Sequence, residues 1–308
     1  MNRAEENVLN YRYLKNNPGH FLWKGNEIRT EEYSDFEGDY EEESQEDLCT
    51  IYDNIIKNAV AEQCSLISSQ KFLEIQSDTI TELNRKHEIE WILHTHQSYN
   101  MAADILYSSL MLFDIFLCSR PVSYDMLRKI SCACLIIGCK IEERDEKSRK
   151  SIIKILDNKV VGETFQQLEI EILKTIDFKL SYPTSKLFLR RTLEMVHPDQ
   201  KKHETAHFFL ELSLQYIDFF DFLPSVIAAS AMSLAFLCEN LQSPFSLIFE
   251  TLYIIDKTKV RECMLKMLEK SVDVIKNPYS NLYARYTMRD MSLVLSDLNV
   301  SPQIIPSL

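Results

Sequence analysis

The segment that decides the fold is residues 114–143, DIFLCSRPVSYDMLRKISCACLIIGCKIEE. It begins at the end of an apolar run, is interrupted by Pro121, and resumes at Ser123, a residue type suited to the N-cap of a helix. The small side chains of residues 131–134 let neighbouring helices approach closely. We therefore expect a helix over 124–140 at the centre of a helical bundle.

The same landmarks recur further along the chain. Asp114-Ile115-Phe116 ends one apolar helix and Asp218-Phe219-Phe220 ends another, and small residues follow each of them, over 131–134 and 228–231. The offset of roughly 100 residues indicates a duplicated unit. Apolar spacing predicts an amphipathic helix over 48–62, five helices between about 81 and 178, and five more between Pro183 and Pro278. The predicted fold class is all-α, with two tandem five-helix repeats after an N-terminal helix.

Glycine is scarce where the chain should be folded. Of five glycines, Gly19, Gly25 and Gly38 precede that region, and residues 39–308 contain only Gly138 and Gly162. Residues 39–308 therefore cannot contain a glycine-rich loop of the kind that binds nucleotides or phosphate.

Acidic residues are concentrated near the N-terminus. Residues 1–47 hold thirteen acidic and five basic residues, so residues 48–308 carry a net charge of −4 out of −12 for the chain. Residues 1–47 are expected to form a disordered, solvated tail. The near-neutral remainder argues against a nucleic-acid partner. Lacking a signal peptide or a long apolar run, the chain is expected to be intracellular, in nucleus or cytoplasm, with no membrane partner.

Two features could suggest a metal, and neither predicts one. The eight cysteines contain no C-x-x-C pair and favour buried, reduced thiols. His203-Glu204-x-x-His207 has the spelling of a zinc-protease helix, but a catalytic zinc needs a third protein ligand. His207 is the last histidine, which leaves an acid such as Glu211 as an arithmetic possibility. We expect no metal and no other cofactor, and interpret Glu204 as a first-turn acid that favours the helix dipole.

Several motifs together resemble the cyclin family, over roughly residues 47–290. HEIEWILHTHQSYN (87–100) is similar to the first helix of a cyclin box and places Trp91 at the family's tryptophan. LFDIFL (112–117) resembles an aspartate-arginine-phenylalanine-leucine stretch, with Ile115 in place of the arginine. GCKIEE (138–143) and LEIEILKTIDFKLSYPTSKLFL (168–189) place Lys140 and Glu169 at the family's lysine and glutamate. LELSLQYIDFFDFLPSVIAASAMSLA (210–235) resembles the second box of A- and B-type mitotic cyclins.

The resemblance implies a non-catalytic subunit that binds and activates a cyclin-dependent kinase and so controls cell-cycle progression. It implies that Lys140 and Glu169 hydrogen-bond to the kinase backbone, and that the helix at 48–62 touches the kinase's other lobe. Without the resemblance, Lys140 would be interpreted as a cation at a helix C-terminus and Glu169 as a solvated acid. The apolar contacts that it implies are Ile137, Ile141, Phe178 and Leu180.

The substrate-docking patch implied by the resemblance consists of Trp91 and the segment NRKHE (84–88). Within this segment only Arg85 matches, because Asn84 and Glu88 are polar where apolar anchors are expected, so docking of Arg-x-Leu substrates is not predicted. The expected organisation is an acidic tail (1–47), an N-terminal helix and first box (48–180), a second box (181–280) and a C-terminal extension (281–308). The alternatives are a cyclin-fold scaffold or transcription-factor-like protein without kinase activation, and a zinc hydrolase.

Overall fold

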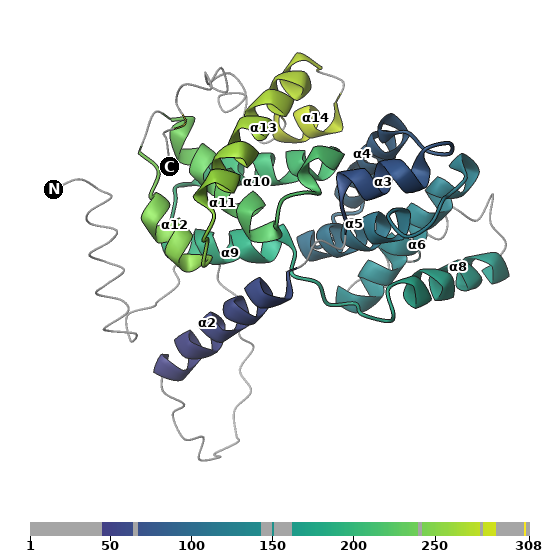
Figure 1. The fold of residues 1–308 in the computed structure, drawn as a ribbon, viewed down its shortest axis with the longest axis horizontal. Helices are drawn as coiled ribbons and strands as arrows, with labels where there is room; N and C mark the ends of the chain where they lie inside the picture. The colour runs from purple at the N-terminus through teal and green to yellow at the C-terminus, as the bar shows by residue number, and fades with distance from the viewer. Residues whose placement is uncertain are drawn as a thin grey trace, which may run out of the picture. The chain divides into compact units, whose positions relative to one another are not determined.

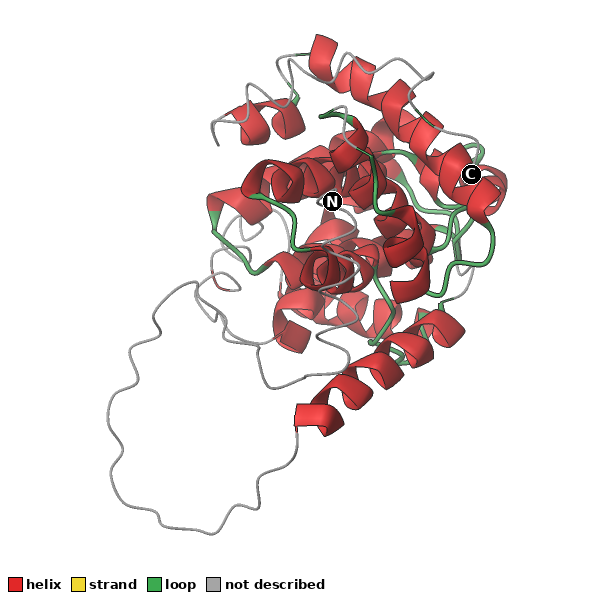
Figure 2. Ribbon diagram, turned by 90° about the vertical axis from the view of Figure 1, so that its left-hand side faces the viewer, coloured by secondary structure: helices red, strands yellow, loops and turns green. Residues whose placement is uncertain are grey.

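The computed structural model describes residues 45–63, 67–142, 150, 162–239, 242–277, 280–287 and 305. These residues are helical or in connecting loops, and none of them lies in a strand (Figure 2). The chain divides into two compact units, Met1–Ala61 and Glu62–Leu308. The all-α prediction is confirmed.

The first unit is described through helix α2 (Gln45–Glu62), which ends just inside the second. The sequence predicts this helix from residue 48. Ile51, Tyr52 and Ile55 are 51, 52 and 47% exposed, whereas Ile56 and Ala59 are buried. The helix therefore presents three large apolar side chains to solvent.

The first repeat consists of the helices that follow α2. The expected helix over 148–158 lies outside the described residues apart from Lys150, and the eight-residue α3 is not predicted from the sequence. Thr81 caps α4 through a capping box, which fixes the start of that helix. The described helices are α3 (Ser69–Gln76), α4 (Glu82–Ser98), α5 (Ala103–Leu117), α6 (Tyr124–Glu142) and α8 (Gly162–Thr175).

The second repeat begins after Pro183, as predicted. A single helix expected over 203–220 is instead two elements, because Tyr216 has an extended backbone (φ −119°, ψ 133°). Pro224 opens α11 at a position where its missing N–H costs nothing. The elements are α9 (Ser185–Val196), α10 (Gln200–Gln215), the 3₁₀ helix η2 (Ile217–Phe219), α11 (Pro224–Leu237), α12 (Phe245–Thr251), α13 (Lys257–Lys276) and α14 (Asn281–Thr287).

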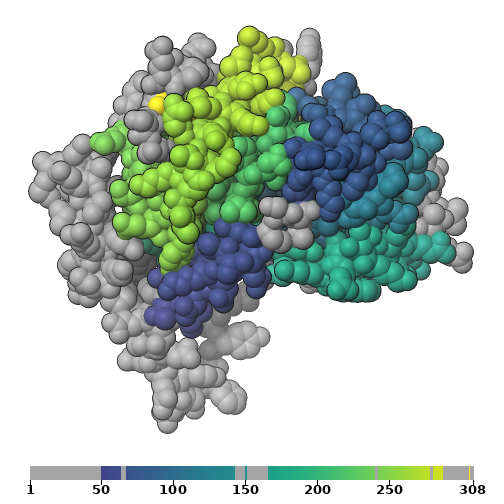
Figure 3. Space-filling view, viewed as in Figure 1, coloured from purple at the N-terminus to yellow at the C-terminus, as the bar shows by residue number. Residues whose placement is uncertain are grey.

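The two helices rich in small residues are the buried centres of their repeats. Residues 131–134 of α6 and 228–231 of α11 are all fully buried. Helix α6 packs on α4, α5 and α8, while α11 packs on α9, α10, α12 and α13 (Figure 1). Helix α13 forms much of the surface of the second repeat that faces the viewer in Figure 3. The prediction that small-residue helices occupy the bundle centres is confirmed.

Gly138 lies at a position where α5 and α6 approach each other closely. A Cβ atom at this position would lie 2.2 Å from Ser109 Oγ and 3.2 Å from the carbonyl oxygen of Ile105. We expect Gly138→Val to lower the free energy of unfolding by about 1–3 kcal/mol, because the two helices must separate. Urea denaturation would measure this loss. Lys129→Val on the same helix is the control for the helix propensity of valine, and an equal loss in both variants would contradict the packing explanation.

Arg85 joins the two repeats from inside the protein. It lies on α4, is 1% exposed, and donates from Nε and Nη2 to the two carboxylate oxygens of Asp114 on α5, at 2.7 and 2.8 Å. The same guanidinium donates to the carbonyl oxygens of Leu214 (3.0 Å) and Gln215 (3.3 Å) at the end of α10. One side chain therefore ties α4 and α5 of the first repeat to α10 of the second.

Six cysteines whose side chains the structure describes are buried and not in disulfides. They are Cys118, Cys132, Cys134, Cys139, Cys238 and Cys263. Burial raises the pKa of Cys118 to about 11 and that of Cys132 to about 12. Both thiols therefore stay protonated and unreactive at neutral pH, as the sequence predicts.

Candidate functional site

Lys140 and Glu169 form an ion pair at the surface of the first repeat. Lys140 lies in the last turn of α6 and Glu169 in α8. The Lys140 ammonium donates to both carboxylate oxygens of Glu169, at 2.7 and 2.8 Å. The side chain of Lys140 is 48% exposed and that of Glu169 is 12% exposed. The structure thus brings together the two residues that the resemblance singles out.

The pair retains hydrogen-bonding capacity for a partner. An ammonium has three donors and a carboxylate about four acceptor sites, more than the contacts within the pair use. An incoming backbone carbonyl could accept from Lys140 while a backbone N–H donates to Glu169. Two adjacent charges of opposite sign can therefore recognise both polar groups of a peptide unit.

Helix α8 is positioned by its own buried face. Leu168 and Ile172 of α8 and Ile176 just after it are at most 5% exposed and form a buried apolar face. The exposed Arg120–Glu171 ion pair adds a contact between α8 and the start of the loop before α6. This packing presents Glu169 beside the end of α6.

The four predicted apolar contact residues differ in accessibility. Phe178 is 62% exposed and Leu180 is 36% exposed, so both can meet a partner. Ile141 is half-buried. Ile137 is 3% exposed and is not accessible to a partner in this conformation, so its contact with a kinase stays a prediction. Because Ile137 belongs to the inward face of α6, its role here is to pack in the core.

The loop after α8 holds Phe178 outward in an unusual backbone conformation. Asp177 and Phe178 have positive φ angles of 51° and 57°. The N–H of Phe178 donates to the carbonyl of Leu173 at 2.8 Å, which terminates the helix. An aromatic residue rarely occupies this region, which marks the position as a constrained one.

One exposed apolar residue beside the ion pair is not predicted from the sequence. Ile170 follows Glu169 on α8 and is 48% exposed. Its sequence signal is an isoleucine outside the apolar spacing of Leu168, Ile172 and Ile176. Its exposure adds apolar area to the surface that carries Glu169.

The two docking-patch residues are engaged within the chain. Arg85, the residue of NRKHE that matches the implied docking patch, has its guanidinium buried against Asp114. Trp91 is half-buried, and the guanidinium carbon of Arg128 lies 3.9 Å from its ring centroid. Arg128 also contacts the buried Glu88 at 2.5 Å. An internal cation–π contact therefore covers one face of the tryptophan.

The zinc-like motif does not gather a third ligand. His203 and His207 lie on α10 with ring centroids 4.7 Å apart, and the Lys186 ammonium is 3.3 Å from Nε2 of His207. Glu211 is 5% exposed and contacts the Arg285 guanidinium at 3.3 Å. Within the described ranges, no three His, Cys, Asp or Glu residues are arranged to hold a metal. None of the described helices is long and apolar enough to cross a membrane.

Family comparison accounts for most of the chain. Residues 54–181 match the cyclin N-terminal domain and residues 183–295 match the cyclin C-terminal domain. The chain therefore belongs to the cyclin family. The junction between the two matched domains falls within the segment that separates α8 from α9.

Curated relatives are A- and B-type cyclins. The chain is 32% identical to Cyclin-A2-1 of Arabidopsis thaliana over 191 residues, which cover 60% of this chain and 42% of that protein. It is 26% identical to the G2/mitotic-specific cyclin-B3 of Mus musculus over 221 residues, which cover 71% of this chain and 16% of that protein. The chain thus matches less than half the length of either relative.

Solved structures share the fold. A viral cyclin from herpesvirus saimiri aligns with a TM-score of 0.59 at 19% identity, covering 71% of this chain and 97% of that one. A chain of the yeast RNA Pol II CTD kinase CTDK-1 complex aligns with a TM-score of 0.58 at 13% identity, covering 80% and 91%. At such identities the likeness concerns the fold alone.

Proposed function

We propose that this chain is a regulatory subunit that binds and activates a cyclin-dependent serine/threonine kinase in control of the cell cycle, inside the cell and without catalytic activity of its own. The observation that carries the proposal is the Lys140–Glu169 pair at the surface of the first repeat, with an exposed Ile170 next to Glu169 on α8 and an exposed Phe178 in the loop that follows this helix. Membership of the cyclin family and the kinship with A- and B-type cyclins support it.

Activation is explained as a shift of the kinase population. A protein kinase transfers phosphate only when a lysine–glutamate pair of its own is in place, which requires one helix to move inward. A subunit that binds only that arrangement raises its population. Moving the equilibrium from 1:99 to 99:1 takes about 5.5 kcal/mol of differential binding.

The surface offers the groups that such binding requires. Lys140 and Glu169 would hold the kinase backbone beside the moving helix, while Ile141, Phe178 and Leu180 supply apolar area. Exposed apolar side chains accompanied by polar groups that can form hydrogen bonds are a feature of protein interfaces. Exposed apolar side chains of α2, in the other compact unit, are candidates for a second contact.

The test measures binding to a cyclin-dependent kinase of the class that A- and B-type cyclins activate. We expect the double variant Lys140→Ala/Glu169→Ala to raise Kd by roughly a hundredfold, because each lost anchor leaves kinase groups without partners. Folding should persist, since an exposed ion pair contributes at most about 1 kcal/mol.

A matched control exists on α13. Lys259 and Glu262 form an exposed ion pair at 2.8 Å, with side chains 51 and 53% exposed. The variant Lys259→Ala/Glu262→Ala should bind the kinase as the wild type does. Equal affinity of all three proteins would place the interface elsewhere. Absence of binding by the wild type would favour a cyclin-fold scaffold.

A further inference from the structure

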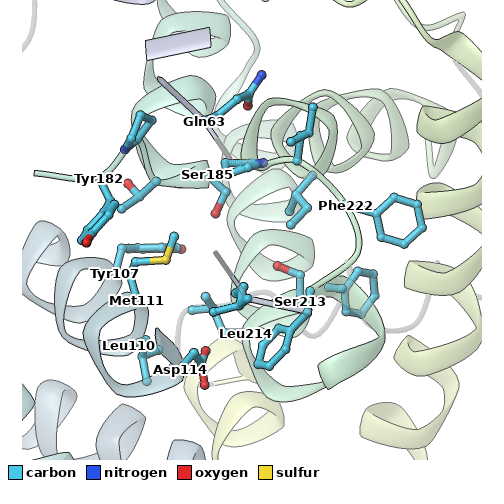
Figure 4. A pocket seen from close by; sticks show the side chains of 18 of the residues that line it. Gln63, Tyr107, Leu110, Met111, Asp114, Tyr182, Ser185, Ser213, Leu214 and Phe222 are labelled. Atoms are coloured by element: carbon cyan, nitrogen blue, oxygen red, sulfur yellow. The ribbon is translucent and has the colours of Figure 1, made fainter. Parts of the chain in front are cut away.

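A partly enclosed cavity of about 90 Å³ lies at the junction of the two repeats, within Glu62–Leu308. Helix α5 contributes Tyr107 and Met111 from the first repeat, and α10 contributes Ser213 and Leu214 from the second (Figure 4). None of the proposed kinase-binding residues lines this cavity. It is therefore a separate feature of the fold.

The cavity wall is mainly apolar and aromatic, with no unbalanced charge in its interior. Two charged groups in the wall, Arg85 and Asp114, neutralise each other in their bidentate pair. Glu62 also belongs to the lining but is solvent-exposed. Such a wall favours an uncharged ligand. Its aromatic members include Tyr107, Tyr182, Phe219, Phe220 and Phe222.

One polar group in the wall has no partner. The Tyr107 hydroxyl is buried without a hydrogen bond, in a side chain that is 4% exposed. Figure 4 shows its oxygen pointing across the cavity toward α10. The nearby Ser213 hydroxyl, in contrast, donates to the carbonyl of Leu210 at 2.7 Å. Buried hydroxyls are rarely left unpaired, so Tyr107 has a donor available for a ligand.

The protonation state of Tyr107 supports this role. Burial raises the pKa of its hydroxyl well above the usual value, and the charge of Glu211 raises it further. The hydroxyl therefore stays protonated and uncharged at neutral pH. It can donate a hydrogen bond, and it carries no negative charge that would attract a cation. A ligand that satisfies this O–H donor offers an acceptor such as a carbonyl oxygen.

We propose that this cavity binds a small uncharged aromatic molecule that carries one hydrogen-bond acceptor facing Tyr107. A closed apolar cavity of about 150 Å³ accommodates benzene. The present cavity is smaller and only partly enclosed, so it has room for part of a single substituted ring, and the rest of the ligand would lie in the opening. Because both repeats line the cavity, such a ligand stabilises their junction. The proposal does not rest on kinase binding.

The test uses the full chain and three probes of similar size: acetophenone, ethylbenzene and benzoate. Isothermal titration calorimetry or a thermal-shift assay should detect binding of acetophenone. Ethylbenzene should bind more weakly, and benzoate should not bind. Tyr107→Phe should weaken acetophenone binding by roughly tenfold and leave ethylbenzene unchanged. The control Tyr124→Phe alters a tyrosine that is 64% exposed and should change neither.

A second variant fills the space. Met111→Trp should abolish the binding of acetophenone and ethylbenzene together, because the larger side chain occupies the cavity. Failure of acetophenone to bind the wild type at millimolar concentration overturns the proposal. Binding that Tyr107→Phe and Met111→Trp both leave unchanged also overturns it, by placing the probe elsewhere. Tyr107→Phe preserves shape, so the test survives if Met111→Trp does not fold.

Discussion

Replacing Arg85 with methionine is expected to lower the free energy of unfolding by about 3–5 kcal/mol near pH 7. The change leaves the buried Asp114 carboxylate without its bidentate partner. It also leaves the carbonyls of Leu214 and Gln215 without a donor. Urea denaturation would measure the loss. Methionine fills much of the space that arginine occupies. Lost packing therefore accounts for only part of the decrease in the free energy of unfolding.

The loss in Arg85→Met should depend on pH. Burial raises the pKa of Asp114, and Arg85 opposes that rise. Without Arg85 the folded-state pKa of Asp114 lies further above its unfolded value. The stability linked to this group is then fully present below the unfolded-state pKa and is lost as pH rises through the folded-state pKa. The variant should therefore approach the wild type as the pH falls from near 7 to near 5.

Two controls separate the buried charge from a general effect of losing arginine. Arg190 and Asp104 form an exposed pair at 2.7 Å, with side chains 48 and 40% exposed. Arg190→Met should cost at most about 1 kcal/mol at either pH. Arg85→Met/Asp114→Leu removes both buried charges and should be more stable than Arg85→Met near pH 7. A mild, pH-independent effect of Arg85→Met would contradict its role as the link between repeats.

Exchanging the charges of the surface pair is expected to abolish kinase activation while preserving the fold. In Lys140→Glu/Glu169→Lys the two side chains can still attract each other. Their hydrogen-bonding roles toward a partner are reversed, since an acceptor now stands where a donor stood. We expect activation to fall by roughly a hundredfold or more, because misplaced buried charges at an interface cost about 2–5 kcal/mol. Histone phosphorylation by the purified complex is the readout.

The matched control exchanges the charges of the Lys259–Glu262 pair on α13. That variant should activate the kinase normally, and circular dichroism should show the same helix content for both exchanged proteins. Normal activation by Lys140→Glu/Glu169→Lys would mean that the pair acts only as an internal salt bridge. In that case the simpler interpretation of each charge, a helix-end cation and a solvated acid, would regain support.

Local sequence patterns predict the architecture well, because the buried face and the ends of a long helix depend on residues within or next to that helix. Small residues at 131–134 and 228–231 identify the central helices, and Pro183 and Pro224 mark breaks between elements. Short elements give less signal. Helix α3 has eight residues, too few for a clear apolar period. The sequence also gives no sign of the break at Tyr216. The segment LQYIDFF (214–220) continues the apolar pattern of α10 past Tyr216, whose backbone is extended.

The site is less predictable because it depends on contacts between distant helices. Resemblance points to Lys140 and Glu169 separately, but their mutual ion pair joins residues 29 positions apart. Arg85 looks like a surface residue within NRKHE, and full burial of an arginine is rare unless it is paired. Its partner Asp114 lies on another helix, so no local pattern reveals the pair. Ile137 likewise belongs to an apolar run whose inward face only packing determines.

The most direct test of the central claim is histone phosphorylation by a cyclin-dependent kinase measured with and without this chain. The kinase should be one of the class that A- and B-type cyclins activate, co-expressed with the full chain. The proposed function predicts activity that appears with the wild-type chain and is lost with Lys140→Ala/Glu169→Ala, both proteins being folded. Silence with every such kinase, or activity indifferent to both residues, would contradict it.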